Sequence, residues 1–179
     1  MNASIRSVTG VLSVVIAFLC ITLYGVSDAT AQQEAGYLKK QIVGTWMLAS
    51  AVATNADGSK FMPFGPTPSG MAVFDANGRF VMLNMSSTLP KFASNNRSTG
   101  TPEENKAIVT GSLGIFGTYS VNEAEKAVAW RVEASTFPNW VGQEQKRPIA
   151  SLTADELRYI NPAPTVGGPS MLFVWTRVK

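Results

Sequence analysis

The chain has 179 residues, 15 of them basic and 12 acidic, with no histidine and a single cysteine, Cys20. Because Cys20 lies in a segment that we expect to be removed, imidazole bases, cysteine nucleophiles, disulfides and His/Cys metal sites are excluded, and no metal or cofactor is expected. The formal net charge of +3 is spread along the chain, so we expect no nucleic-acid partner.

Residues 1–31 have the pattern of a cleaved secretory signal peptide. Arg6 is the only charged residue before an apolar run over residues 11–24, and the segment ends in the small-residue motif Ala29-Thr30-Ala31. The alternative is an uncleaved membrane anchor, but the run is about 14 residues long and a spanning helix needs roughly 17–25. We therefore expect a domain of residues 32–179 that is exported, periplasmic or secreted, with no stable membrane insertion after cleavage.

From residue 41 onward, short β-type runs alternate with turn residues, which indicates an all-β domain. The first run covers residues 42–54 and follows a short polar lead at residues 36–41. Its even positions Trp46, Leu48 and Val52 are larger than their odd neighbours, so we expect these side chains to face the core.

The next two runs form a predicted hairpin. Residues 71–74 and 79–84 flank a turn that contains Asn-Gly, a strong short-range signal for neighbouring antiparallel strands. On the second strand Phe80 and Met82 share a face with Asn84, but the opposite face is also partly apolar. Alternation alone therefore leaves the inward side of this strand open.

Residues 86–112 are the longest interruption of the β pattern. The first half reads as a loop, and the second half begins a helix at Thr101-Pro102-Glu103-Glu104. Threonine at the N-cap, proline at the first helical position and a glutamate placed for a capping box predict one short helix between strands. Its apolar stripe is modest, enough to rest on another surface.

The rest of the chain returns to β runs separated by turn clusters, and the total is eight strands. The clearest alternation, in which Val128, Trp130, Val132 and Ala134 share one face, predicts that Trp130 points inward. Eight antiparallel strands in chain order favour an up-and-down barrel, and a barrel of that size leaves an interior able to hold one small ligand. The five later runs are residues 114–121, 127–135, 147–152, 156–160 and 170–178.

Two motifs carry a family resemblance. Gly44-Thr45-Trp46, early on the first strand, resembles the Gly-x-Trp signature of lipocalins, in which the tryptophan plugs the closed end of the barrel. The resemblance implies an arginine across that indole from the last strand, a place that Arg177 occupies here. A cation over an aromatic face contributes roughly 0.5–2 kcal/mol.

The expected mature chain as a whole resembles the bacterial lipocalin-like domain proteins, whose activity is unassigned. Barrels of this kind serve as carriers and, less often, as isomerases and cyclases, so the resemblance implies the fold rather than an activity. The segments that carry it include Asp57-Gly58-Ser59, Pro63-Phe64-Gly65, residues 89–97 and 100–105, Phe116-Gly117-Thr118-Tyr119, residues 135–140 and Asn161-Pro162-Ala163-Pro164.

Two irregular segments, residues 91–97 and 137–140, combine aromatics with amides and a guanidinium, which suits the mouth of a pocket. We interpret residues 86–112 as a lid over the open end, because long irregular segments in compact domains are usually functional. The alternative is that the aromatics anchor loops or fill the core while the amides satisfy loop backbone. The candidate ligand-binding residues are Phe64, Phe80, Met82, Phe92, Asn95, Asn96, Arg97, Tyr119, Trp130, Phe137 and Trp140.

Two functional classes follow. The first is a binder of a small, largely apolar molecule in the barrel interior, favoured by many Met and aromatic residues and by the lack of a base with a neutral pKa. The alternative is an isomerase or cyclase that uses a buried carboxylate or Tyr119 as its acid or base, although Glu133 lies on a face that reads as outward. A protein-binding barrel is a third class, and the oligomeric state is left open.

The signal-peptide assignment predicts that the exported protein begins near Gln32. The intact mass of protein recovered from the exported fraction should match a chain that starts there. A mass that retains Met1 would contradict the assignment.

Overall fold

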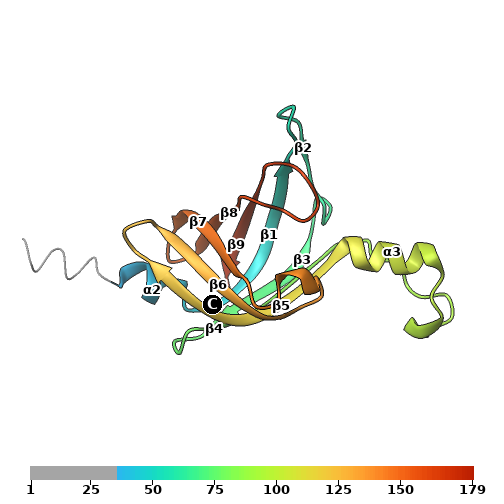
Figure 1. Ribbon diagram of the computed structural model, residues 1–179, viewed down its shortest axis with the longest axis horizontal. Helices are drawn as coiled ribbons and strands as arrows, with labels where there is room; N and C mark the ends of the chain where they lie inside the picture. The colour runs from blue at the N-terminus through green and yellow to red at the C-terminus, as the bar shows by residue number, and fades with distance from the viewer. Residues whose placement is uncertain (1–35) are drawn as a thin grey trace, which may run out of the picture. The chain divides into compact units, whose positions relative to one another are not determined.

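The computed structural model describes residues 36–179, and the predicted signal peptide lies outside the described residues. Within these residues, two short α-helices and two 3-10 helices accompany the strands (Figure 1): α2 (Tyr37–Ile42), η1 (Arg97–Thr99), α3 (Pro102–Gly111) and η2 (Pro138–Trp140). The strands are β1 (Gly44–Thr54), β2 (Lys60–Phe61), β3 (Ser69–Phe74), β4 (Arg79–Met85), β5 (Ser112–Asn122), β6 (Ala127–Ser135), β7 (Glu144–Leu152), β8 (Glu156–Asn161) and β9 (Ser170–Arg177).

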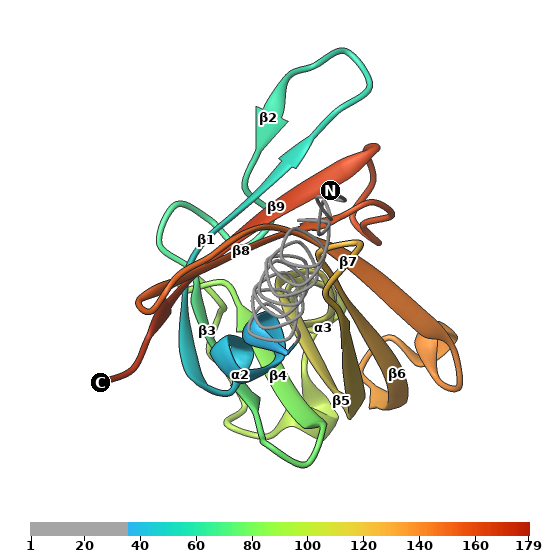
Figure 2. The ribbon, with the colours of Figure 1, turned by 90° about the vertical axis from the view of Figure 1, so that its left-hand side faces the viewer.

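Eight of these strands close into an antiparallel barrel, which confirms the predicted fold class. The sheet order is β1, β3 and then each strand in turn to β9, and β9 returns to pair with β1 (Figure 2). β2 is a short addition that pairs with the end of β1 at Ala53 and Thr54. Closure pairs the first strand of the main sheet with the last, from Trp46 to Thr54 of β1.

Trp46 and Arg177 seal one end of the barrel, as the sequence predicted. The indole of Trp46 is fully buried and its Nε1 donates to the carbonyl of Ile42 at 2.9 Å. The Arg177 Cζ lies 4.0 Å from the Trp46 ring centroid, and the guanidinium donates to the carbonyls of Gln41 and Val43. A Cβ at Gly44 would collide with this guanidinium, so glycine gives the cation room at the plug.

One expectation about β1 is wrong. A β-bulge between Leu48 and Ser50, seen in the pairing with β9, shifts the alternation of side chains along the strand. As a result Ala51 and Ala53 are buried, whereas Val52 is only partly buried. The predicted inward facing of Trp46 and Leu48, which precede the bulge, is confirmed.

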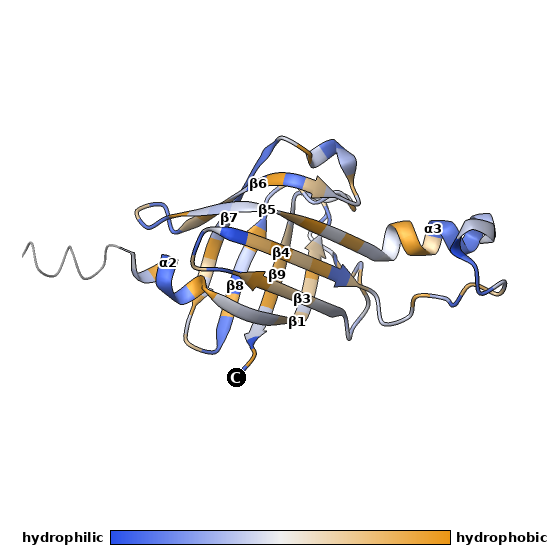
Figure 3. Ribbon diagram, turned by 90° about the horizontal axis from the view of Figure 1, so that it is seen from below, coloured by the Kyte–Doolittle hydropathy of each residue, from blue (hydrophilic) through white to orange (hydrophobic). Residues whose placement is uncertain are grey.

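The structure settles the facing of β4. Phe80, Met82 and Asn84 are buried, and the alternate residues Val81 and Leu83 are exposed on the outer face. The predicted Asn-Gly hairpin joins β3 to β4. In the figure coloured by hydropathy, β3, β4 and β5 run side by side along the barrel wall (Figure 3).

The predicted helix is confirmed as α3, with the predicted capping box. The Thr101 hydroxyl accepts from the backbone N–H of Glu104 at 3.2 Å, and the Glu104 carboxylate accepts from the backbone N–H of Thr101 at 2.9 Å. The helix extends beyond the barrel end rather than across it (Figures 1 and 3). Among residues 36–179, no helix has the length and apolar character needed to cross a membrane.

Helix α2 was not predicted, because the sequence of this short segment reads only as a polar lead. Its first turn is held by a residue that is distant in the chain: the Glu123 carboxylate accepts from the backbone N–H groups of Leu38 and Lys39, at 3.1 and 2.9 Å. A carboxylate at a helix N-terminus satisfies orphan donors and complements the helix dipole. Tertiary contact therefore supplies the cap that the local sequence lacks.

The sealed end predicts strong coupling between Trp46 and Arg177. Trp46→Ala should lower the free energy of unfolding by about 3–5 kcal/mol, the range for large core truncations, and Arg177→Ala should lower it by less. The double variant should lose less than the sum of the two single losses, because each residue contacts the other. Urea unfolding of the four proteins measures this cycle, and strict additivity would show that the contact contributes nothing.

Candidate functional site

A set of buried aromatic rings fills the barrel interior on the sealed side. Phe80 stacks on Trp130 with ring centroids 5.3 Å apart, and Trp130 meets the edge of Tyr159 at the same distance. Tyr159 stacks in turn on Phe173 at 5.0 Å, and Phe173 lies 6.3 Å from Trp175. We call these five rings the aromatic floor. The part of the barrel on the other side of them, away from Trp46, is its open half.

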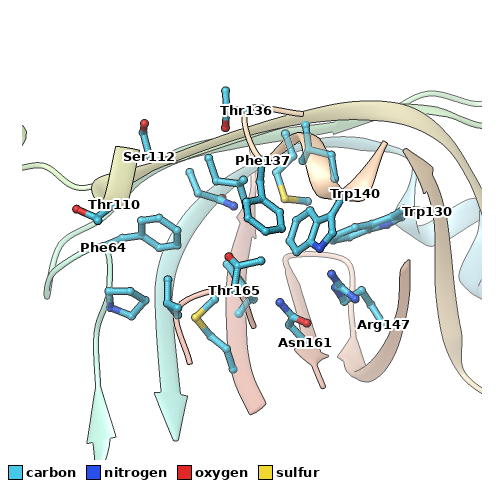
Figure 4. Close-up of a pocket in the computed structure, with 18 of the residues that line it drawn as sticks. Phe64, Thr110, Ser112, Trp130, Thr136, Phe137, Trp140, Arg147, Asn161 and Thr165 are labelled. Atoms are coloured by element: carbon cyan, nitrogen blue, oxygen red, sulfur yellow. The ribbon is translucent and has the colours of Figure 1, made fainter. Parts of the chain in front are cut away.

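A cavity of about 490 Å³ lies above this floor, at the end away from Trp46. All four connections at that end contribute to its lining: Pro63 and Phe64, Val109 and Thr110, Phe137 and Trp140, Thr165 and Val166. Val109 is 75% exposed, so the cavity reaches the surface. Most of the wall is apolar (Figure 4), and the strands add Met82, Asn84, Ile115, Trp130, Arg147, Tyr159, Asn161, Met171 and Phe173.

Three buried polar side chains face this cavity, one each from β4, β7 and β8. Asn84, Arg147 and Asn161 are 1%, 2% and 3% exposed. The Oδ1 of Asn161 accepts from the backbone N–H of Ala163 at 3.1 Å. Within the described part of the chain, the Oδ1 of Asn84 and the Nε1 of Trp130 have no hydrogen-bond partner. Buried polar atoms are normally paired, so these two mark the lining as a place for polar contacts.

Arg147 is the one charged residue among the residues that line the cavity. Its Cζ lies 4.9 Å from the Trp130 ring centroid and 5.7 Å from that of Trp140. Its Nη1 donates to the carbonyl of Lys146 at 3.0 Å and its Nη2 to the Gln145 Oε1 at 3.2 Å. Burial lowers the pKa of Arg147 to about 10, because the charged form loses hydration, and the side chain remains a cation at neutral pH.

The tyrosines near the cavity are poorly suited to proton transfer at neutral pH. Burial raises the pKa of Tyr159, whose hydroxyl donates to the Met82 sulfur at 3.5 Å. Tyr119 is outside the lining, and its hydroxyl donates to the carbonyl of Asp75 at 2.7 Å. Burial, with a smaller effect of the Asp75 charge, raises the pKa of Tyr119 to about 12. The lining contains no aspartate or glutamate.

The structure brings five of the candidate residues together around the cavity: Phe64, Met82, Trp130, Phe137 and Trp140. Phe80 and Tyr119 are buried outside the lining, Phe80 in the aromatic floor and Tyr119 against Phe74, with ring centroids 5.1 Å apart.

The structure does not bring the other four candidates, Phe92, Asn95, Asn96 and Arg97, to the cavity. Phe92 packs against Gly100 within the loop, and the side chain of Asn96 caps η1 by accepting from the backbone N–H of Ser98 at 3.0 Å. Asn95, Asn96 and Arg97 are exposed. Of the segment interpreted as a lid, only its C-terminal end, with Val109, Thr110 and Ser112, lines the cavity.

Sequence reasoning missed the three buried polar residues of the lining. One signal for Arg147 existed, because it shares strand parity with the buried Ile149. Asn84 was placed on a face with Phe80 and Met82, but that face was not identified as inward. Among residues 36–179 no cluster of three or more acidic, histidine or cysteine side chains is arranged to hold a metal ion.

Comparison with known proteins points to one family. A family model described as a lipocalin-like domain matches residues 43–176, which span the whole barrel. The chain is also similar to the crystal structure of a lipocalin-like protein from Bacteroides uniformis, at 14% identity and a TM-score of 0.43, over 77% of this chain and 99% of that one. None of the curated proteins is significantly similar to this chain.

The burial of Tyr119 predicts a measurable dependence of stability on alkaline pH. Its folded pKa is raised above the ordinary value, so its stabilising contribution is complete below pH 10 and is lost as the pH rises towards about 12. Tyr119→Phe should be less stable by about 1 kcal/mol at neutral pH, through loss of the bond to Asp75, yet should lose less stability between pH 10 and 12. Urea midpoints at neutral and alkaline pH test this, and parallel losses would contradict it.

Proposed function

The chain belongs to the lipocalin-like domain family, and we propose that it binds a small, largely apolar molecule in the cavity at the open end of its barrel. The fold alone does not establish this, because barrels of one architecture serve different functions. The proposed binding role rests on the geometry of the site, and the observation that carries it is the cavity.

The size and lining of the cavity support a binding role. Small-molecule sites are typically concave, about 300–1,000 Å³ in volume, and mostly apolar with a few polar groups that fix orientation. The cavity of about 490 Å³ fits this description, with Phe64, Phe137 and Trp140 in the wall and three buried polar side chains. Residues from all four connections at that end surround it, so a ligand would be enclosed by the barrel rather than held on its surface.

The enzymatic alternative receives less support from the geometry. An isomerase or cyclase needs a group that exchanges protons near neutral pH, placed against the substrate. The lining has no carboxylate, and its tyrosine, Tyr159, has a pKa raised by burial. The residues present favour binding and orientation over acid–base chemistry.

The proposed place of action is outside the cytoplasm, in the periplasm or beyond the cell. This part of the proposal rests on the pattern of residues 1–31.

A neutral apolar probe tests the binding role. N-phenylnaphthylamine should bind with a rise in its own fluorescence and with quenching of tryptophan emission, because Trp130 and Trp140 lie in the lining. Phe137→Ala removes one aromatic wall and should weaken this binding about tenfold, which corresponds to about 1.4 kcal/mol of lost contact.

The matched control is Phe116→Ala, the same substitution on the outer face of β5, where the ring is 44% exposed. This variant should bind the probe as the unmodified protein does, and urea midpoints of both variants separate lost binding from lost stability. Failure of the unmodified protein to bind any apolar probe would overturn the proposed function. If both substitutions weaken probe binding equally, the probe does not bind in the cavity.

A further inference from the structure

Arg147, the cationic side chain in the cavity lining, occupies an inward-facing strand position that is usually apolar in a barrel. Along β7, Arg147 and Ile149 are buried while Lys146 and Pro148 are exposed, so Arg147 faces the interior. It lies against Trp130 in the floor and against Trp140 in the wall. Figure 4 draws its guanidinium at the same end of the cavity as these two indoles.

Arg147 has no counter-ion within the described residues. Four ion pairs occur among residues 36–179, and all involve partly or largely exposed side chains rather than the cavity. The acidic residue nearest to it in sequence, Glu144, is exposed. The pairs are Arg79–Glu133, Lys146–Glu125, Arg158–Glu156 and Lys179–Asp155.

The hydrogen bonds of the guanidinium leave part of its donor capacity unused. An arginine presents five N–H donors in a planar fork. Within the described structure Arg147 makes one bond from Nη1 and one from Nη2, both to neutral oxygens, and none from Nε. The two indole rings restrict the orientation of the guanidinium, so the remaining donors are held ready for a partner.

A buried cation without an anionic partner is costly, and proteins normally pair such a group. In this cavity the partner has to come from outside the described chain. A single cation balances a single negative charge, whereas a phosphate dianion would leave an excess charge in an apolar wall. A carboxylate is monoanionic, and its planar shape matches the arginine fork for two parallel hydrogen bonds.

We infer that the ligand is an apolar carboxylic acid whose carboxylate pairs with Arg147, while its apolar body lies against Phe64, Phe137 and Trp140. The inference rests on the proposed function and specifies the ligand class for the same cavity. The unpartnered Nε1 of Trp130 adds a neutral donor in the same lining. Polar contacts of this kind orient the head group and leave the tail to the apolar wall.

A series of probes with one tail and different head groups tests the inference on the unmodified protein. Decanoate, decanol and decylamine should compete with bound N-phenylnaphthylamine, and decanoate should bind about tenfold to a hundredfold more tightly than decanol, the ratio expected for a charge-assisted hydrogen-bonded pair. Decylamine should bind most weakly, because its ammonium would face Arg147.

Two variants in β7 test whether Arg147 causes the preference for decanoate over decanol. Arg147→Met should abolish the advantage of decanoate over decanol while it retains binding of decanol and of the neutral probe. Lys146→Met removes the same charge from a neighbouring side chain that is 52% exposed, and should leave the advantage intact. Because the head-group series needs no variant, the inference stays testable even if Arg147→Met does not fold.

The outcomes separate the two proposals. If decanol and the neutral probe bind but decanoate has no advantage, the carboxylate inference is wrong and the proposed function stands. If none of the ligands binds, both are wrong. An advantage of decanoate that survives in Arg147→Met, or disappears in Lys146→Met, would overturn the assignment to Arg147.

Discussion

The contact between Arg177 and Trp46 determines which end of the barrel is closed. The guanidinium lies over the indole and donates to backbone carbonyls in α2, in the residue after it and between β7 and β8. The guanidinium of Arg177, on the last strand, therefore connects the start of the first strand and a turn at the same end of the barrel. This end is sealed, and the cavity lies at the opposite end of the barrel.

In the described part of the chain, the barrel interior has a side packed with aromatic rings and a side that contains the cavity. The aromatic floor of Phe80, Trp130, Tyr159, Phe173 and Trp175 packs the sealed side, and the connections at the other end enclose the remaining space. The buried polar side chains stand at this boundary instead of in the packed core. A buried charge without an anionic partner lowers stability, and the proposed ligand is inferred from this cost.

Much of the fold could be predicted from the sequence, because its signals are local. Period-two alternation gave the strands, and an Asn-Gly turn placed one hairpin. Thr101 and Glu104 marked the start of α3 through capping. The pairing of Trp46 with Arg177 came from a family resemblance and is confirmed by their contact. Five of the eleven candidate site residues lie around the cavity, while their role in binding and the signal peptide stay predictions.

The sequence by itself therefore determined the number and order of the eight barrel strands and the position of the capped helix, since neighbours in the chain decide these features, whereas the short β2 was not predicted. Only the tertiary structure decided which way ambiguous residues point. A bulge in β1 turned Ala51 and Ala53 inward, pairing with β3 and β5 fixed the inner face of β4, and closure placed Arg147 in the cavity. Register and bulges depend on pairing with distant strands, and the direction of a long connection depends on what it packs against, so neither is encoded in local pattern.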